Sequence, residues 1–87
     1  MSSIGEAKEK LAAASVSADE AKTALGSVGT AIDEAVEFLN EAAAGSDHEK
    51  VAEALTAYQD AVEKFEDILA LIEQGQLAAN EYAEGLG

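Results

Sequence analysis

Apolar residues recur along the first half of the chain with a seven-residue period. The first row holds mostly large side chains: Ile4, Leu11, Ala18, Leu25, Ile32 and Leu39. A second row follows three residues later and holds mostly alanine: Ala7, Ala14, Ala21, Val28, Ala35 and Ala42. Two such rows form one apolar stripe on an α-helix, as in a coiled coil. The pattern predicts a helix over about residues 3–44 with both rows in its core-facing stripe.

The second half carries a similar stripe in the same period. Its first row is Val51, Tyr58, Phe65, Ile72, Ala79 and Leu86, and its second row, four residues on, is Leu55, Val62, Leu69, Gln76 and Ala83. The chain has no proline, which is the strongest helix breaker. The pattern predicts a second helix over about residues 47–84, with Gln76 as a polar residue in its core stripe.

The two stripes are separated by a short polar segment. Gly45 is expected to end the first helix in a left-handed conformation, and Ser46-Asp47-His48-Glu49 matches a capping box that opens the next one. A turn at residues 45–46 forces the helices to lie antiparallel. We therefore expect an all-α fold, a single coiled-coil-like helical hairpin over residues 1–87, in which residue i lies near residue 91−i.

Two glycines interrupt the first predicted helix. Gly26 and Gly29 each cost about 1 kcal/mol relative to alanine inside a helix, and Thr30 with Asp33 offers a signal for a fresh start. The alternatives are one continuous helix with a weak point or two helices. We predict the continuous helix, because the seven-residue rows keep the same phase on both sides.

A second set of apolar residues runs beside the main stripes. It consists of Ala24, Ala31 and Phe38 in the first helix and Ala54, Ala61, Ile68 and Tyr82 in the second. These residues either widen the interface within the hairpin or form an interface with another chain. We predict the intermolecular interface, in which hairpins complete a helical bundle, because two helices alone leave their outer flanks in water.

The chain is strongly acidic, with 18 Asp and Glu against 5 Lys and a formal charge of −13. Binding to a phosphate backbone needs clustered basic residues, so nucleic acid is not an expected partner. The acidity fits self-repulsion in solution, a basic partner, or adaptation to high salt. No apolar run is long enough for a membrane span, and the N-terminus has no signal-peptide pattern. The expected location is the cytoplasm, or the exterior after export without a cleaved signal peptide.

Candidate catalytic chemistry is sparse. There is no cysteine, and the single histidine, His48, is expected in the solvated first turn of the second helix. The spacings typical of zinc, di-metal and calcium sites are missing, and carboxylate groups such as Glu34, Glu37 and Glu41 are typical of a solvated helix face. We therefore predict no catalytic residue, no cofactor and no metal site, and a protein that is not an enzyme.

The short acidic chain, its alanine-rich heptads and its central Gly45 turn resemble the two-helix proteins of bacterial type VII secretion, the WXG-type family. The Trp-x-Gly signature of the family is missing, because Ala43-Ala44-Gly45 stands at the turn. The family's C-terminal export signal, a tyrosine followed four residues later by an acidic residue, is also missing, because Leu86 stands four residues after Tyr82. A related uncharacterised group of small bacterial helical proteins is an equally good match. The resemblance implies an accessory or targeting partner in a secretion or toxin-delivery system.

Taken together, these features predict a noncatalytic protein–protein interaction module. Its expected partner is a second copy or another helical protein. The alternative is a structural subunit of a filament, a shell or another self-assembled particle.

Overall fold

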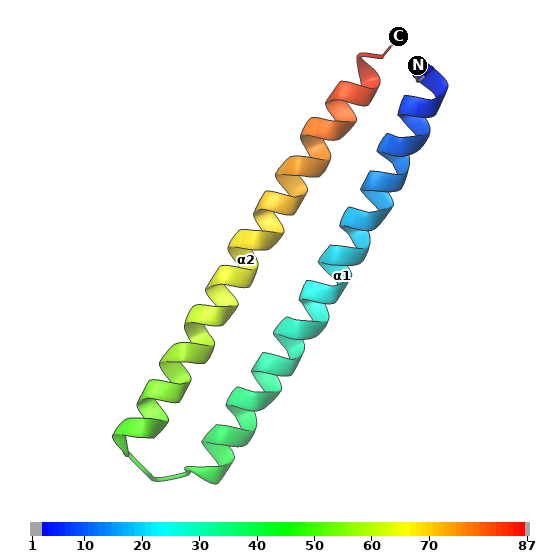
Figure 1. Cartoon of the computed structure of the whole chain (residues 1–87). Coiled ribbons are helices and arrows are strands. Elements are labelled where there is room, and N and C mark those ends of the chain that lie inside the picture. The colour runs from blue at the N-terminus through cyan, green and yellow to red at the C-terminus, as the bar shows by residue number, and fades with distance from the viewer. Residues whose placement is uncertain (1–2, 87) are drawn as a thin grey trace.

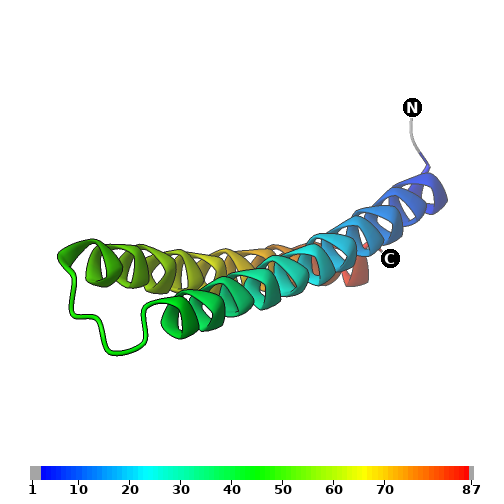
Figure 2. The same ribbon diagram turned by 90° about the horizontal axis from the view of Figure 1, so that it is seen from below.

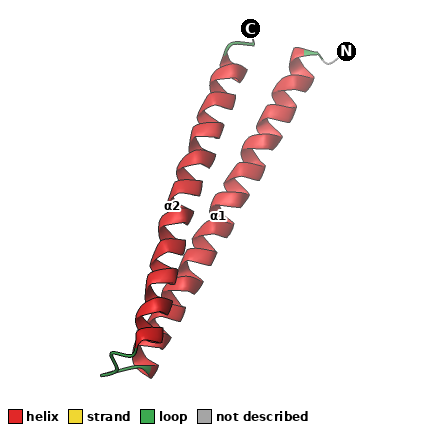
Figure 3. Ribbon diagram, turned by 60° about the vertical axis from the view of Figure 1, so that its left-hand side comes forward, coloured by secondary structure: helices red, strands yellow, loops and turns green. Residues whose placement is uncertain are grey.

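The computed structural model, which describes residues 3–86, is a hairpin of two long antiparallel helices (Figure 1). The helices are α1, Ile4–Ala42, and α2, Glu49–Glu84. The start of α1 and the end of α2 lie at the same end of the molecule, which measures 64 × 17 × 15 Å. The predicted all-α hairpin is confirmed, and no strand occurs between residues 3 and 86 (Figure 3). Neither helix contains a stretch apolar enough to cross a membrane.

Capping and back-bonding hydrogen bonds explain why α1 starts where it does and stays continuous. The backbone N–H of Glu6 donates to the Ser3 hydroxyl at 3.1 Å, which satisfies a free donor of the first turn. The helix passes through Gly26 and Gly29 without a break, as predicted. Thr30 does not cap a new helix, because its hydroxyl donates to the carbonyl of Gly26 at 3.1 Å within the same helix.

The turn is longer than predicted and is built differently (Figure 2). Gly45 has the expected positive φ, 79°, but it belongs to a β-turn in which the N–H of Ser46 donates to the carbonyl of Ala43 at 2.8 Å. The N-cap of α2 is His48, whose Nδ1 accepts from the N–H of Lys50 at 3.0 Å. The prediction that Ser46 caps α2 was wrong, since its hydroxyl accepts from the N–H of His48 instead.

The line along which α1 and α2 contact each other is here called the seam. In α2 it follows the two predicted rows, of which Tyr58, 36% exposed, is the least covered member. In α1 the first predicted row is correct from Leu11 to Leu39, whereas Ile4 at its start is 57% exposed. The second row was wrong at four positions, which are exposed: Ala14, Ala21, Val28 and Ala42. The residue after each of these four is half-buried: Ser15, Lys22, Gly29 and Ala43. Ala35 is half-buried as predicted, together with Val36 beside it.

The hydrogen bonds of Gln76 accompany the shifted row, because Ser15 belongs to that row and Asp19 lies on the same flank of α1. Leu69 and Val62 of α2 lie across the seam from Lys22 and Gly29, and the four residues line one groove. Val62 and Leu69 face these two positions without filling the space, because a Cβ added at Gly29 would meet no atom within 4 Å. The register agrees with the pairing of residue i with residue 91−i, because the Gln76 side chain donates to the Ser15 carbonyl at 3.2 Å.

The hairpin leaves much of its surface in water. None of residues 3–86 is fully buried, and the chain exposes 6431 Å². A compact protein of 8.9 kDa exposes about 4,800 Å² on average. The seam is therefore half-covered throughout.

Candidate interaction surface

One broad side of the hairpin is apolar. Helix geometry places two further rows of each helix on the same side of the seam. This apolar face consists of Ala14, Ala21, Ala24, Val28, Ala31 and Phe38 of α1, with Ala54, Ala57, Ala61, Ile68, Leu71, Ala78 and Tyr82 of α2. Ala14 and Gly75, which belong to these rows, line one groove together with Ser15 and Gln76 of the seam, so the rows of both helices meet on one side.

The apolar face contains all seven residues predicted for an intermolecular interface. Five of them are exposed: Ala24, Ala31, Phe38, Ile68 and Tyr82. Ala54 and Ala61 are half-buried, so they widen the contact between α1 and α2 as well as bordering the open surface. The interface with another chain stays a prediction for the five exposed positions.

Sequence reasoning missed Leu71, which is 64% exposed and lies between Ala57 and Ala78 in its row. Lys64 interrupts that row and hides the apolar pattern. Val28 was expected in the seam and is instead 41% exposed on the apolar face. The sequence signal for Leu71 is its seven-residue spacing from Ala78. This spacing identifies a row of the apolar face only when the position of α1 shows on which side of the hairpin the row lies.

The opposite side of the hairpin, here called the acidic face, is polar. One groove on this side is lined by Asp33 and Val36 of α1 and by Gln59 and Glu63 of α2. Another, near the open end, is lined by Lys8 and Ala12 of α1 and by Asn80 and Glu84 of α2. Val16 and Leu77 are exposed apolar residues that lie outside the apolar face.

Charge is segregated between the two sides. The rows of the seam and of the apolar face contain no Asp or Glu, so all carboxylates of the two helices lie on the acidic face or on the outer backs. The only charged residues in the rows of the apolar face are Lys10, Lys50 and Lys64. A chain with a charge of −13 thus has one side whose rows carry no Asp or Glu, and Glu53 of the adjacent outer back pairs with Lys50 at the edge of this side, at 2.9 Å.

A polar cluster crosses the seam in the half of the hairpin near the termini. The Gln76 side-chain amide donates to Asp19 Oδ1 at 2.9 Å as well as to the Ser15 carbonyl. Lys22 Nζ lies 3.3 Å from Asp19 Oδ1. The aliphatic part of the Lys22 side chain therefore lies along the seam while its ammonium group is paired with a carboxylate. The Gln76 hydrogen bond and then Lys22 hold the pKa of Asp19 below its ordinary value.

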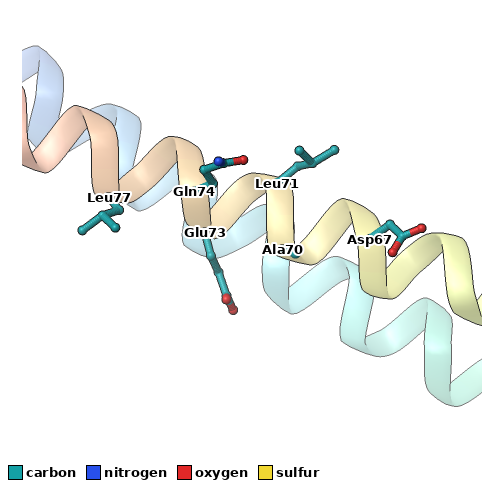
Figure 4. Close-up of a pocket in the computed structure, with 6 residues that line it drawn as sticks. All are labelled: Asp67, Ala70, Leu71, Glu73, Gln74 and Leu77. Carbon is teal, nitrogen blue, oxygen red and sulfur yellow. The ribbon is translucent and has the colours of Figure 1, made fainter.

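Residues that carry reactive groups are occupied or dispersed. His48 Nδ1 accepts the capping hydrogen bond, so this nitrogen is engaged in holding the start of α2. Within residues 3–86, no three His, Asp or Glu side chains are grouped closely enough to hold a metal ion. One surface depression is lined by six residues of α2 alone, and its labelled side chains diverge from one another rather than enclosing a space (Figure 4).

Comparison of the chain with protein-family models, with curated proteins and with solved structures finds no match.

Proposed function

We propose that this protein is a noncatalytic protein–protein interaction module that works by burying its apolar face against another helical surface. The observation that carries the proposal is the exposure of Val28, Phe38, Ile68, Leu71 and Tyr82 on one side of a hairpin. A contiguous apolar surface of this kind is typical of a binding site. A helical partner fits this face best, since apolar rows at heptad spacing suit the packing of one helix against another.

The architecture supports a setting for this module. An acidic two-helix hairpin with a short turn resembles the small proteins of type VII secretion, so we place it as an accessory or targeting partner in a bacterial secretion or toxin-delivery system. The acidic face stays outside when the apolar face is covered. It then attracts basic surfaces over a distance of about 10 Å at moderate salt, which favours encounter with a basic component of such a system.

A second candidate is a structural subunit of a filament or shell. It is favoured by apolar surface at the open end of the hairpin, where Ile4 is 57% exposed and Tyr82 is 61% exposed. Contacts that join this region to a different part of the next copy are heterologous and generate open assemblies. Fibres or particles in electron micrographs of the purified protein would favour this candidate over a discrete complex.

The test of the proposed module is the native mass of the tagged protein in an extract of its source cells. We expect the wild type to migrate in a complex well above 8.9 kDa. Ile68→Glu places a charge on the apolar face and is expected to release the monomer with unchanged helicity. The matched control is Leu77→Glu, which puts the same charge on an exposed leucine outside that face. An Ile68→Glu variant that keeps the mass of the wild type would refute the proposal.

A further inference from the structure

We infer that the acidic face binds a second partner, a basic amphipathic helix that lies along the seam and inserts an apolar side chain and an arginine between α1 and α2. The inference goes beyond the proposed function, because it concerns the side of the hairpin opposite the apolar face. It is carried by two adjoining grooves, by the open space at the glycines of α1 and by the carboxylates that border the grooves.

The two grooves follow one another along the acidic face. The first, here called the glycine groove, lies between Gly26 of α1 and Leu69 of α2. The second, here called the carboxylate groove, lies between Asp33 of α1 and Glu63 of α2. Val62 lines both, so the grooves form one continuous surface. Gly26 and Asp33 are seven residues apart in one row of α1, which places the two grooves about 10 Å apart along the helix.

The glycine groove has an apolar floor and open space above it. Leu25, Phe65 and Leu69 line the groove, and each is half-buried. A Cβ added at Gly26 or at Gly29 would meet no atom within 4 Å, so the packing of α1 against α2 does not require either glycine. The groove has a volume of about 210 Å³, which is the volume of about seven water molecules. A leucine side chain of a partner fits this space and covers apolar surface that is now in contact with water.

The carboxylate groove selects a positively charged side chain. Asp33 and Glu63 line it from the two helices, together with the half-buried Val36. Within residues 3–86 the carboxylates that pair with a lysine are those of Asp19 and Glu53, so the charges of this groove are not neutralised. An arginine covers the apolar part of such a groove with its aliphatic stem and donates hydrogen bonds from its planar guanidinium to the carboxylates.

The two grooves together specify a helix with a defined spacing. The glycine groove holds the carboxylate of Glu66 and the ammonium of Lys22, which already pairs with Asp19, so it favours an apolar side chain. Residues seven apart lie in one row of a helix and about 10 Å apart along it, which matches the distance between the grooves. An extended strand spans this distance in about three residues, and their side chains point to opposite faces. The partner therefore carries an apolar residue and an arginine seven residues apart on a helix.

The test is the binding of a fluorescently labelled peptide, measured by anisotropy at about 0.15 M salt. The probe is an alanine-based helix of about 20 residues with a leucine and an arginine seven residues apart in one row. The control peptide has the same composition, with the leucine and the arginine on opposite sides of the helix. We expect a Kd below about 100 µM for the probe and at least tenfold higher for the control peptide. A weaker Kd for the probe, or a smaller difference between the peptides, would overturn the inference.

A substitution that fills the glycine groove tests its place without changing the charge. Gly26→Leu is expected to raise the Kd of the probe at least tenfold. The matched control is Gly75→Leu, at another helical glycine whose added Cβ would meet no atom within 4 Å but which lines a groove of the apolar face. It is expected to bind the probe as the wild type does. Binding that survives Gly26→Leu and is lost in Gly75→Leu would place the probe on the apolar face and overturn the inference.

A second pair of variants separates the carboxylate groove from attraction to the net charge. Glu63→Gln removes one charge from the groove and is expected to raise the Kd of the probe at least fivefold. Glu34→Gln removes the same charge from the outer back of α1 and should leave the Kd within twofold. Equal effects of the two substitutions would show attraction by net charge alone and overturn the inference.

Two further measurements keep the outcomes distinct. Circular dichroism of each variant separates loss of binding from loss of folding, and Gly26→Leu is expected to unfold at a higher temperature than the wild type, because leucine favours a helix over glycine. The native mass in the cell extract tests the proposed module separately, because Ile68 lies on the apolar face and lines neither groove. A probe that fails to bind, with a complex in the extract that depends on Ile68, would refute only the second partner.

Discussion

The side-chain amide of Gln76 donates to Asp19 Oδ1 at 2.9 Å, and this hydrogen bond joins α2 to α1 across the seam. Gln76 is the one polar residue in the two core rows predicted for the second half of the chain, apart from the hydroxyl of Tyr58. Its pairing with Asp19 and Ser15 satisfies the amide and fixes one axial register, in the way that a polar core residue specifies register in coiled coils. Sliding the helices by one turn would break both bonds.

The coupling between Gln76 and Asp19 should depend on pH. Gln76 and Lys22 lower the pKa of Asp19 in the folded chain, so the ionised carboxylate stabilises the fold. This contribution is present above the pKa of Asp19 in the unfolded chain and is lost as pH falls through the lowered pKa. A double-mutant cycle of Asp19→Ala and Gln76→Ala, followed by chemical denaturation, should show a more favourable coupling free energy at about pH 7 than at about pH 2.

Acid also protonates the other carboxylates and relieves the repulsion among them. The cycle is needed because this second effect is common to its four proteins and cancels from the coupling free energy. A coupling free energy that is the same at both pH values would contradict the role assigned to the ionised Asp19.

The glycines inside α1 should be replaceable with a gain in stability. A Cβ added at Gly26 or Gly29 meets no atom within 4 Å, and both residues have helical backbone. Gly26→Ala and Gly29→Ala should each raise the free energy of unfolding by about 1 kcal/mol. Gly45→Ala is the control with the opposite sign, since its φ of 79° costs an alanine about 1 kcal/mol. Thermal unfolding that shows all three variants destabilised would mean that the helical glycines serve close packing.

His48 should contribute to stability through its cap. Removing the acceptor of the Lys50 N–H with His48→Ala should cost about 1 kcal/mol, and His48→Ser or His48→Asp should restore or exceed the wild-type value. Urea denaturation monitored by circular dichroism measures the effect. Ser, Asp and Ala variants of equal stability would show that the Nδ1 hydrogen bond has no net value.

Two leucines of α2 offer a matched test of the apolar face. Leu71 lies on that face and is 64% exposed, whereas Leu77 lies outside it and is 60% exposed. The two side chains project from different sides of α2 (Figure 4). Leu71→Ala should weaken association through this face at least tenfold, because it removes a side chain that association buries, and Leu77→Ala should have no effect. Equal Kd values for the two variants by sedimentation would exclude the apolar face as the contact surface.

The heptad rows of the sequence determine most of the fold. Their length and unbroken phase predict two long helices. The short polar segment around Gly45 predicts that the helices lie antiparallel, because a connection of a few residues joins antiparallel neighbours. The predicted rows of α2 are at the correct positions. The continuity of α1 through Gly26 and Gly29 follows from the phase of its first row. The pattern identifies Gln76 as a polar core residue but not its partners, since they lie 57 and 61 residues away in sequence.

The tertiary structure decides which second row of α1 joins the seam. On an isolated helix, the rows three and four residues after Leu11 lie at similar angles from it, one on each side, and the alanine row is the more apolar choice. The structure places Ser15 and Gly29 in the seam, and this rotation of α1 brings the Ser15 carbonyl and Asp19 within hydrogen-bonding distance of the Gln76 amide. The row of Ala14 and Ala21 is thereby left exposed on the apolar face. Sequence alone determined that two amphipathic helices fold back on each other, and only their packing determined which apolar residues remain exposed.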